Sequence, residues 1–255
     1  MASDVDCPKC GGSGFIIVEG AGVSGAKPCD CRFQGRAGRM EERAQIPPLY
    51  RDASFETFSV RRDNPVAGRP LSQVVTAVRA YARDFPDATR PGLLLVGETG
   101  TGKTHLAVAV LRKIIEKGFE GLFCNYQTLL NSIKAGYDPA SNSSNREAYR
   151  SALDAEVLLL DDLGAHRVTD WVEDTVTSII TYRCDNRKPL IATTNLPDPA
   201  AGSVVIQRNA LDKVEYRRTL EEQIGTRARS RLFEMCTVVT MPQIEDYRVS
   251  GGKRL

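Results

Sequence analysis

Histidine and long apolar runs are both scarce in this chain of 255 residues. The only two histidines are His105 and His166, so histidine-rich metal sites and Ser-His-Asp catalysis are nearly excluded. No apolar run reaches the roughly 18–20 residues that span a bilayer. The N-terminus also lacks a basic segment followed by an apolar one, so we expect no secretory signal peptide. These absences predict a cytoplasmic protein with no membrane partner.

An excess of charge is missing as well. Lys and Arg number 34 against 32 Asp and Glu, which gives a net charge of +2. A chain without a basic excess does not bind nucleic acid with its whole surface, so any such contact must be local. Apolar residues make up 42% of the sequence, enough at this length for the core of one α/β domain and a small appendage.

The seven cysteines are odd in number and come without an export signal. A cytosolic chain keeps its thiols reduced, which points the clustered cysteines toward metal binding. Two close pairs follow the pattern C-x2-C-x18-C-x-C: Cys7, Cys10, Cys29 and Cys31. Four such thiolates match a tetrahedral Zn²⁺ site, and the glycines after Cys10 permit a turn that brings backbone amides to the sulfurs. An iron–sulfur cluster, or reduced cysteines without metal, are the alternatives.

The composition changes along the chain and predicts its division into parts. The N-terminal part is rich in Gly and Cys but poor in large apolar residues, so it cannot build a core of its own. A charged helical stretch over 36–46 follows as a linker. We expect a four-cysteine zinc-binding module over 1–35, a linker and lead-in segment over 36–70, the main domain over 71–248 and a disordered tail over 249–255.

Short apolar runs alternate with helical patterns through the main domain. The expected strands are 93–96, 122–126, 157–161, 190–194 and 237–241. The expected helices are 71–85, 104–117, 127–135, 171–185 and 217–232, with a polar loop over 136–148. The apolar runs are continuous, as in parallel strands that are covered on both faces. The alternation therefore predicts an α/β fold with a doubly wound parallel five-stranded sheet.

The stretch GETGTGKT lies between the first of these strands and the helix that follows it. Its glycines let the backbone N–H groups face a phosphate, and the helix N-terminus adds partial positive charge. Lys103 can reach the β- and γ-phosphates, and Thr104 can bind Mg²⁺. A plain glycine-rich turn is the alternative. The expected nucleotide-binding residues are those of the loop, its flank and one acid: Gly97, Glu98, Thr99, Gly100, Thr101, Gly102, Lys103, Thr104, His105 and Asp161.

Polar residues end two later strands. Asp161 and Asp162 follow the run VLLL, where Asp161 would hold Mg²⁺ through water and Asp162 would polarise the attacking water as a general base. Asn195 ends the next strand and is a candidate to orient that water, with Thr194 a weaker one. The alternatives are acids that cap a turn and an asparagine that forms a turn before Pro197.

Four stretches together resemble the DnaC/DnaI/IstB branch of the AAA+ ATPases: GLLLVGETGTGKTHLAVAVL, DAEVLLLDDLGA, LIATTNLP and IGTRARSRLFEM. The resemblance implies a P-loop (AAA+) sheet, here without the C-terminal helical lid of most AAA+ proteins, since little sequence follows the last strand. It implies an ATPase that loads the replicative helicase, binds single-stranded DNA and self-associates into an ATP-dependent oligomer. IstB-type members assist a transposase instead. A zinc-dependent adaptor with a structural nucleotide is a third interpretation.

Three arginines crowd the stretch GTRARSRL. On a helix Arg227 and Arg231 share a face, whereas Arg229 is turned away, so the three do not form one basic stripe. The resemblance implies that Arg231 points into the ATP site of a neighbouring molecule, with Arg227 beside it. Arg229 is expected to face solvent. A surface face whose arginines pair with Glu221 and Glu222 is the alternative.

The resemblance also implies a helix that faces single-stranded DNA after the second strand. Tyr126, Lys134 and Tyr137 lie there, and stacking with one or two phosphate contacts is the expected mode. An ordinary surface helix is the alternative. The resemblance further implies that the N-terminal module docks the helicase.

Overall fold

Five parallel strands form the central sheet in the order β4-β5-β6-β3-β9. The computed structural model describes residues 7–20, 23–29, 31–58, 65–135, 144–166, 168–202, 206–208 and 214–244. The strands are β3 (Gly92–Val96), β4 (Gly121–Asn125), β5 (Val157–Asp161), β6 (Leu190–Thr194) and β9 (Cys236–Thr240). The predicted doubly wound five-stranded sheet is confirmed, and each strand lies within one residue of its expected bounds.

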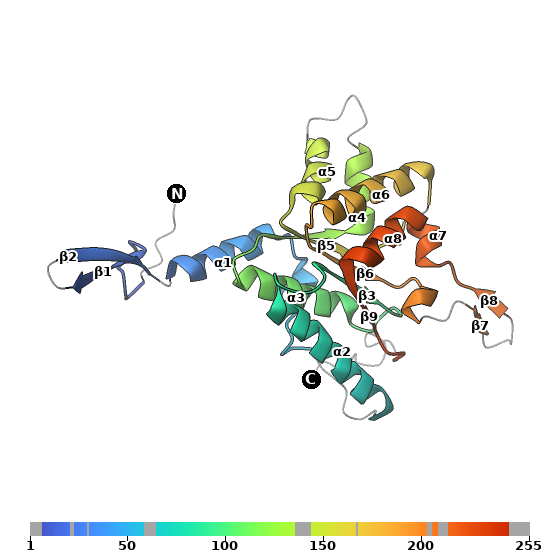
Figure 1. Ribbon diagram of the computed structural model, residues 1–255, viewed down its shortest axis with the longest axis horizontal. Helices are drawn as coiled ribbons and strands as arrows, with labels where there is room; N and C mark the ends of the chain where they lie inside the picture. The colour runs from blue at the N-terminus through green and yellow to red at the C-terminus, as the bar shows by residue number, and fades with distance from the viewer. Residues whose placement is uncertain are drawn as a thin grey trace.

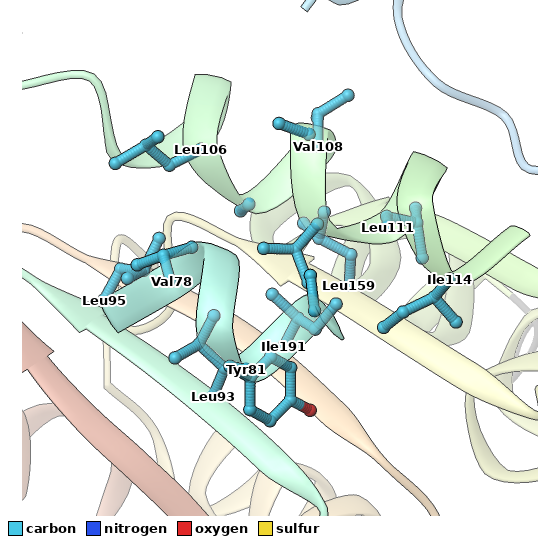
Figure 2. Close-up of a cluster of buried hydrophobic side chains, with 14 of the residues drawn as sticks. Val78, Tyr81, Leu93, Leu95, Leu106, Val108, Leu111, Ile114, Leu159 and Ile191 are labelled. Carbon is cyan, nitrogen blue, oxygen red and sulfur yellow. The ribbon is translucent and has the colours of Figure 1, made fainter. Parts of the chain in front are cut away.

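Successive residues of the buried strands face opposite sides of the sheet and build two separate cores. Leu93, Leu95, Leu159 and Ile191 meet helices α2 (Pro65–Asp84) and α3 (Lys103–Glu116) on one face, as Figure 2 shows. The alternate strand residues meet the helices of the other face: α4 (Tyr126–Ala135), α6 (Asp170–Asp185), α7 (Leu220–Ile224) and α8 (Thr226–Met235). The layers are visible in Figure 1.

Two helical predictions are wrong. The predicted loop over 136–148 overlaps helix α5 (Ser144–Asp154), while 136–143 lies outside the described residues. The end of α5 is held by Arg183, a fully buried α6 residue that donates to the carbonyls of Ala152, Leu153 and Ala155. The helix predicted over 217–232 breaks at Gly225, whose φ of 82° lies in the left-handed region that favours glycine.

The N-terminal part contains a hairpin of β1 (Phe15–Gly20) and β2 (Val23–Pro28), which the composition did not predict. Helix α1 (Cys31–Arg43) connects it to the main domain, and the hairpin stands away from that domain in Figure 1. The domain end of α1 is fixed, since Arg112 pairs with Glu41 at 2.8 Å and the Phe123 amide donates to the Ala44 carbonyl at 2.7 Å.

The remaining elements connect the end of β6 with α7. They are η2 (Pro199–Ala201) and a second hairpin of β7 (Ile206–Arg208) and β8 (Val214–Tyr216). A further short helix, η1 (Pro48–Tyr50), precedes α2. Among the helices that the structure describes, none is long and apolar enough to cross a membrane.

Candidate functional site

The phosphate loop runs from the end of β3 to the start of α3 at Lys103. Gly102 has φ 87°, and a Cβ there would lie 2.6 Å from the Phe58 ring. A Cβ on Gly97 would lie 2.6 Å from the Cβ of Met241. Both glycines are therefore required by backbone conformation or by close approach, so the GxxxxGKT pattern coincides with a loop that only glycine can form.

Side chains of the loop close onto its own backbone. The Lys103 Nζ donates to the carbonyl oxygen of Glu98 at 2.7 Å, and the Thr101 hydroxyl donates to the same oxygen at 2.8 Å. Lys103 is only 6% exposed, so its charge is held inside the loop. When a phosphate binds, its charged oxygens would replace the Glu98 carbonyl as the acceptor for the Lys103 ammonium, because they are better acceptors.

Asp161 is a buried acid at the carboxyl end of β5. Burial raises the pKa of its carboxyl, and the charge of Asp162 adds to this, while hydrogen bonds from Thr193 and Thr104 and the charge of Lys103 work against it. The Thr193 hydroxyl donates to Oδ1 of Asp161 at 2.7 Å. A desolvated carboxylate beside a threonine hydroxyl suits Mg²⁺, an oxygen-binding cation that would relieve the cost of the buried charge.

Asp162 and Asn195 line the same cavity as the phosphate loop. Asp162 is exposed and has φ 57°, and its amide donates to the Thr193 hydroxyl at 3.0 Å. Thr193 thus holds both acids, a role that the sequence pattern did not indicate. Thr194 is fully buried, and its hydroxyl donates to the Leu163 carbonyl at 2.9 Å, so it is not free to orient a water molecule.

The cavity has a volume of about 510 Å³ and combines a polar and an apolar side. The polar side is the phosphate loop with Asp162 and Asn195. The apolar side comes from the lead-in segment and from both ends of the main domain: Leu49, Tyr50, Phe58, Leu71 and Ile244. An apolar wall next to a phosphate site suits the flat ring of a nucleotide base. Sequence reasoning missed these residues because none belongs to a motif with fixed spacing.

His105 also lines the cavity and holds the lead-in segment against α3. Its Nε2 donates to the Ser54 carbonyl at 2.8 Å and lies 3.3 Å from the Thr57 hydroxyl. The ring meets Phe58 edge to face, with the centroids 5.3 Å apart. This histidine therefore contributes to the site by fixing the wall that Phe58 and Thr57 form.

The three arginines of α8 lie in different surroundings. Arg227 is exposed and makes no ion pair with any residue that the structure describes. The Arg231 side chain is 43% exposed and pairs at the surface with Glu234 at 2.8 Å and Asp185 at 4.0 Å. The alternative that the three arginines pair with Glu221 and Glu222 is met, among the residues that the structure describes, only by Arg229, which lies 3.8 Å from Glu221.

Arg229 does not face solvent, so that prediction is wrong. Its guanidinium forms two hydrogen bonds, at 2.6 and 2.8 Å, with the fully buried carboxylate of Asp198, and it covers the Phe233 ring at 4.5 Å. Burial alone would raise the pKa of Asp198, but Arg229 and the amides of Ala200 and Ala201 bring it below its ordinary value. The sequence offered no signal, because Asp198 lies 31 residues away.

Three of the four clustered cysteines come together. The sulfurs of Cys7, Cys10 and Cys29 all lie within 4.8 Å of one another, with Cys7 and Cys29 3.8 Å apart. A tetrahedral zinc with Zn–S bonds of ≈ 2.3 Å sets its sulfurs about 3.8 Å apart. The Gly14 amide donates to the Cys10 sulfur at 3.3 Å, so the glycine turn brings an amide to a thiolate as expected. These donors fit zinc; the side chain of Cys31 lies outside the described residues.

The predicted DNA-facing helix is α4. Tyr126 is only 1% exposed and packs in the core, so its proposed stacking on DNA is wrong. Lys134 is exposed near the end of the helix, and Tyr137 lies outside the described residues. Among the candidates that the structure describes, only Lys134 is available for contact with a phosphate.

Known proteins resemble this chain in sequence. A family model of the IstB-like ATP binding protein matches residues 50–214, a stretch of 165 residues that contains the phosphate loop and both aspartates. The chain is 24% identical over 248 residues to the phage-like element PBSX protein XkdC of Bacillus subtilis (strain 168), covering 92% of this chain and 81% of that protein. It is 22% identical over 165 residues to the replicative helicase loader DnaC of Escherichia coli (strain K12), covering 64% of each.

Two solved structures are similar to this chain in fold. The crystal structure of the DnaC helicase loader matches with a TM-score of 0.60 and 29% identity, over 77% of this chain and 100% of that chain. The crystal structure of DnaI matches with a TM-score of 0.56 and 20% identity, over 82% of this chain and 99% of that chain. The second likeness concerns the fold alone.

Proposed function

The chain belongs to the IstB-like ATP-binding protein family, within the AAA+ group that also contains DnaC-like helicase loaders, and we propose that it is an ATP-dependent loader of a replicative DNA helicase. The observation that carries the proposal is the cavity of about 510 Å³, in which a complete phosphate loop faces Asp162 and Asn195 on a fold similar to a helicase loader. Family membership agrees with the motifs that first indicated it.

ATP hydrolysis is the proposed reaction of this cavity. The loop amides and Lys103 bind the phosphates, and Asp162 takes up the proton of the water that attacks the γ-phosphorus, so that ADP and phosphate form. Asn195 orients that water. Thr104 is the proposed ligand of Mg²⁺ and Asp161 would hold the ion through water; the ion when bound would neutralise charge on the phosphate oxygens.

Self-association is the second part of the proposal. Arg231, with Arg227 beside it, would reach the γ-phosphate of ATP held by a neighbouring copy. Both side chains extend from α8 and neither lines the cavity of its own chain, which supports a role across an interface. A guanidinium keeps its charge and presents forked donors to phosphate oxygens. The oligomer would then form only around bound ATP.

The N-terminal module is the proposed docking site for the helicase. Cys7, Cys10 and Cys29, with Cys31, would hold one Zn²⁺, which when bound would fix the turns of a module that has little core. Apolar side chains of the hairpin are exposed: Phe15 by 44%, Ile17 by 73% and Val18 by 49%. Exposed apolar residues beside few charges favour contact with a protein over contact with DNA.

Single-stranded DNA is the second proposed partner, bound locally. Because Tyr126 is buried, the contact on α4 would be a phosphate contact of Lys134 rather than stacking on that ring.

Assistance to a transposase is the other candidate function. This function is favoured because the matching family is that of IstB-like proteins. The similarity to a protein of a phage-like element supports action on a mobile element. Both candidates share the ATP site and differ in the protein that is bound.

A pull-down tests the proposal directly. The tagged chain is immobilised with ATP, exposed to native lysate of its source cells, and the captured proteins are identified by mass spectrometry. We expect the replicative helicase to be enriched over the same experiment with Lys103→Ala, whose loop cannot neutralise the γ-phosphate. Enrichment of a transposase would favour the other candidate, and capture of neither would contradict both.

A further inference from the structure

Arg217 lies where three segments meet. It follows strand β8 directly and precedes the start of α7 at Leu220. Its Nη1 donates to the carboxylate of Glu98, the second residue of the phosphate loop, in an ion pair. Its Nη2 donates to the backbone carbonyl of Asn195 at 3.2 Å. One guanidinium thus joins the phosphate loop to the end of β6 and to the segment that enters α7.

Glu98 is an unfavourable residue for a loop that binds a polyanion. Its backbone carbonyl accepts from Lys103 and Thr101, so its position in the loop is fixed. A carboxylate on a residue of the phosphate loop repels the phosphate charge that Lys103 attracts. Arg217 offsets this repulsion with a guanidinium that is always charged, and it is the more buried partner, with 25% of its side chain exposed against 41% for Glu98.

The same tether extends along the chain to α8. Helix α7 follows Arg217 and joins α8 through Gly225, where a Cβ would overlap the Glu173 carboxylate. The connection is therefore tight, and α8 carries both arginines that we assign to the neighbouring site. A shift of Arg217 would act on the phosphate loop at one end and on this pair of helices at the other.

We propose that Arg217 is a positioning residue of the chain's own nucleotide site: it neutralises Glu98 and holds the phosphate loop against the end of β6, so that the loop accepts ATP. This inference rests on the proposed function, because it concerns the same site. It differs from the role of Arg231 in that Arg217 acts within its own chain and through Glu98, without touching the phosphates.

A double-mutant cycle tests whether Arg217 supports ATP binding by neutralising Glu98. The Kd for a fluorescent ATP analogue is measured at low salt for the parent chain, Arg217→Ala, Glu98→Gln and the double variant. We expect Arg217→Ala to weaken binding about tenfold, because it leaves the Glu98 charge unpaired beside the phosphates. Glu98→Gln should bind more tightly than the parent, because it removes the repelling charge and keeps Arg217, and Arg217→Ala should then cost less than about twofold in the Glu98→Gln background. The loss should shrink at high salt.

The matched control is Arg218→Ala, an exposed arginine one residue further along, which should bind like the parent. An Arg217→Ala loss that persists in the Glu98→Gln background would overturn the proposal, as would unchanged or weaker binding by Glu98→Gln alone. The latter comparison holds even if Arg217→Ala folds poorly, because it leaves Arg217 in place. No ATP binding by the parent would overturn the proposed function, and the inference with it; parent binding with an unchanged Arg217→Ala would overturn the inference alone.

Discussion

Asp161 is a residue of the site whose carboxylate is buried, where an ionised carboxylate is energetically unfavourable. It is 5% exposed, and burial raises its pKa although Thr193 and Thr104 donate to it. Binding of Mg²⁺ with a nucleotide would relieve this cost. The stability of the fold should therefore depend on pH and on bound Mg²⁺ through this one carboxyl group.

Asp161→Asn should stabilise the nucleotide-free protein at neutral pH. An acid whose folded pKa is raised costs nothing below the ordinary value of about 4, because it is then protonated in both states. The cost develops as pH rises from that value through the folded pKa. Asparagine can still accept from Thr193, so only the charge is removed.

Thermal melting without nucleotide checks this. The variant should melt at nearly the parent temperature at pH 4 or below and a few degrees above it at pH 8, by roughly 2–4 °C per kcal/mol. With Mg²⁺ and ATP the order should reverse, because only the parent gains from the cation. A variant that is less stable than the parent across the whole pH range would contradict the assignment.

For the helices and strands, prediction succeeded where the pattern is local. The strands and the phosphate loop are read from continuous apolar runs and from glycines whose need arises within a few residues. Helix α5 was missed because its polar sequence is held by Arg183 of α6, about 30 residues away. The break at Gly225 was missed because its cause, the close approach of Glu173, lies on another helix.

The residues of the candidate site also divide into those that local motifs predict and those that depend on contacts between distant segments. Lys103, Asp161, Asp162 and Asn195 follow from motifs at strand ends, which a parallel sheet brings to one edge. Thr193, Arg217 and the apolar wall depend on contacts between segments that lie far apart in the sequence. Arg229 is the clearest failure, since helical spacing indicates its face but not the buried acid that it meets there.

Arg229→Ala should destabilise the fold by about 3 kcal/mol at pH 7, because it leaves the buried Asp198 carboxylate without its partner. Since the folded pKa of Asp198 is lowered, the contribution of the pair is present above about pH 4 and is lost as pH falls through that lower value. Urea denaturation of parent and variant at a series of pH values measures it.

Arg227→Ala is the control, since this exposed arginine lies on the same helix and should change stability by less than about 0.5 kcal/mol. Equal effects of the two substitutions, or an Arg229→Ala effect that does not shrink in acid, would show that Asp198 does not need its partner.

In the whole molecule, helix α1 joins two parts that differ in how much apolar core they contain. The main domain has two apolar cores, whereas the hairpin leaves Phe15, Ile17 and Val18 exposed and relies on the cysteine cluster. With the proposed zinc bound, such a module would gain its stability from the metal, because metal binding and folding would then be the same event. Loss of metal should therefore be felt at one end of the molecule only.

The purified protein should contain about one Zn²⁺ per chain by elemental analysis. Replacing Cys29 and Cys31 together by Ser should release the metal and make the first segment sensitive to protease, while ATP binding is kept. Cys184→Ser, outside the cluster, is the control and should retain the metal. Iron with visible absorbance would indicate a cluster instead, and a metal-free protein with a protease-resistant N-terminus would refute the metal site.

A mixing experiment tests whether the ATP site is completed by a second copy. Arg231 pairs only with exposed acids among the described residues, and such pairs contribute little, so its guanidinium can leave Glu234 and Asp185 for a phosphate at small cost. Arg231→Ala should bind ATP like the parent yet hydrolyse it roughly a hundredfold more slowly or worse, because the charge that develops on the phosphate is no longer stabilised. Adding Lys103→Ala, which is inactive in its own site but keeps Arg231, should restore part of the activity. The chain carrying both substitutions should restore none, since it has no arginine to offer. Full activity of Arg231→Ala alone would instead mean that this arginine serves only the surface of α8.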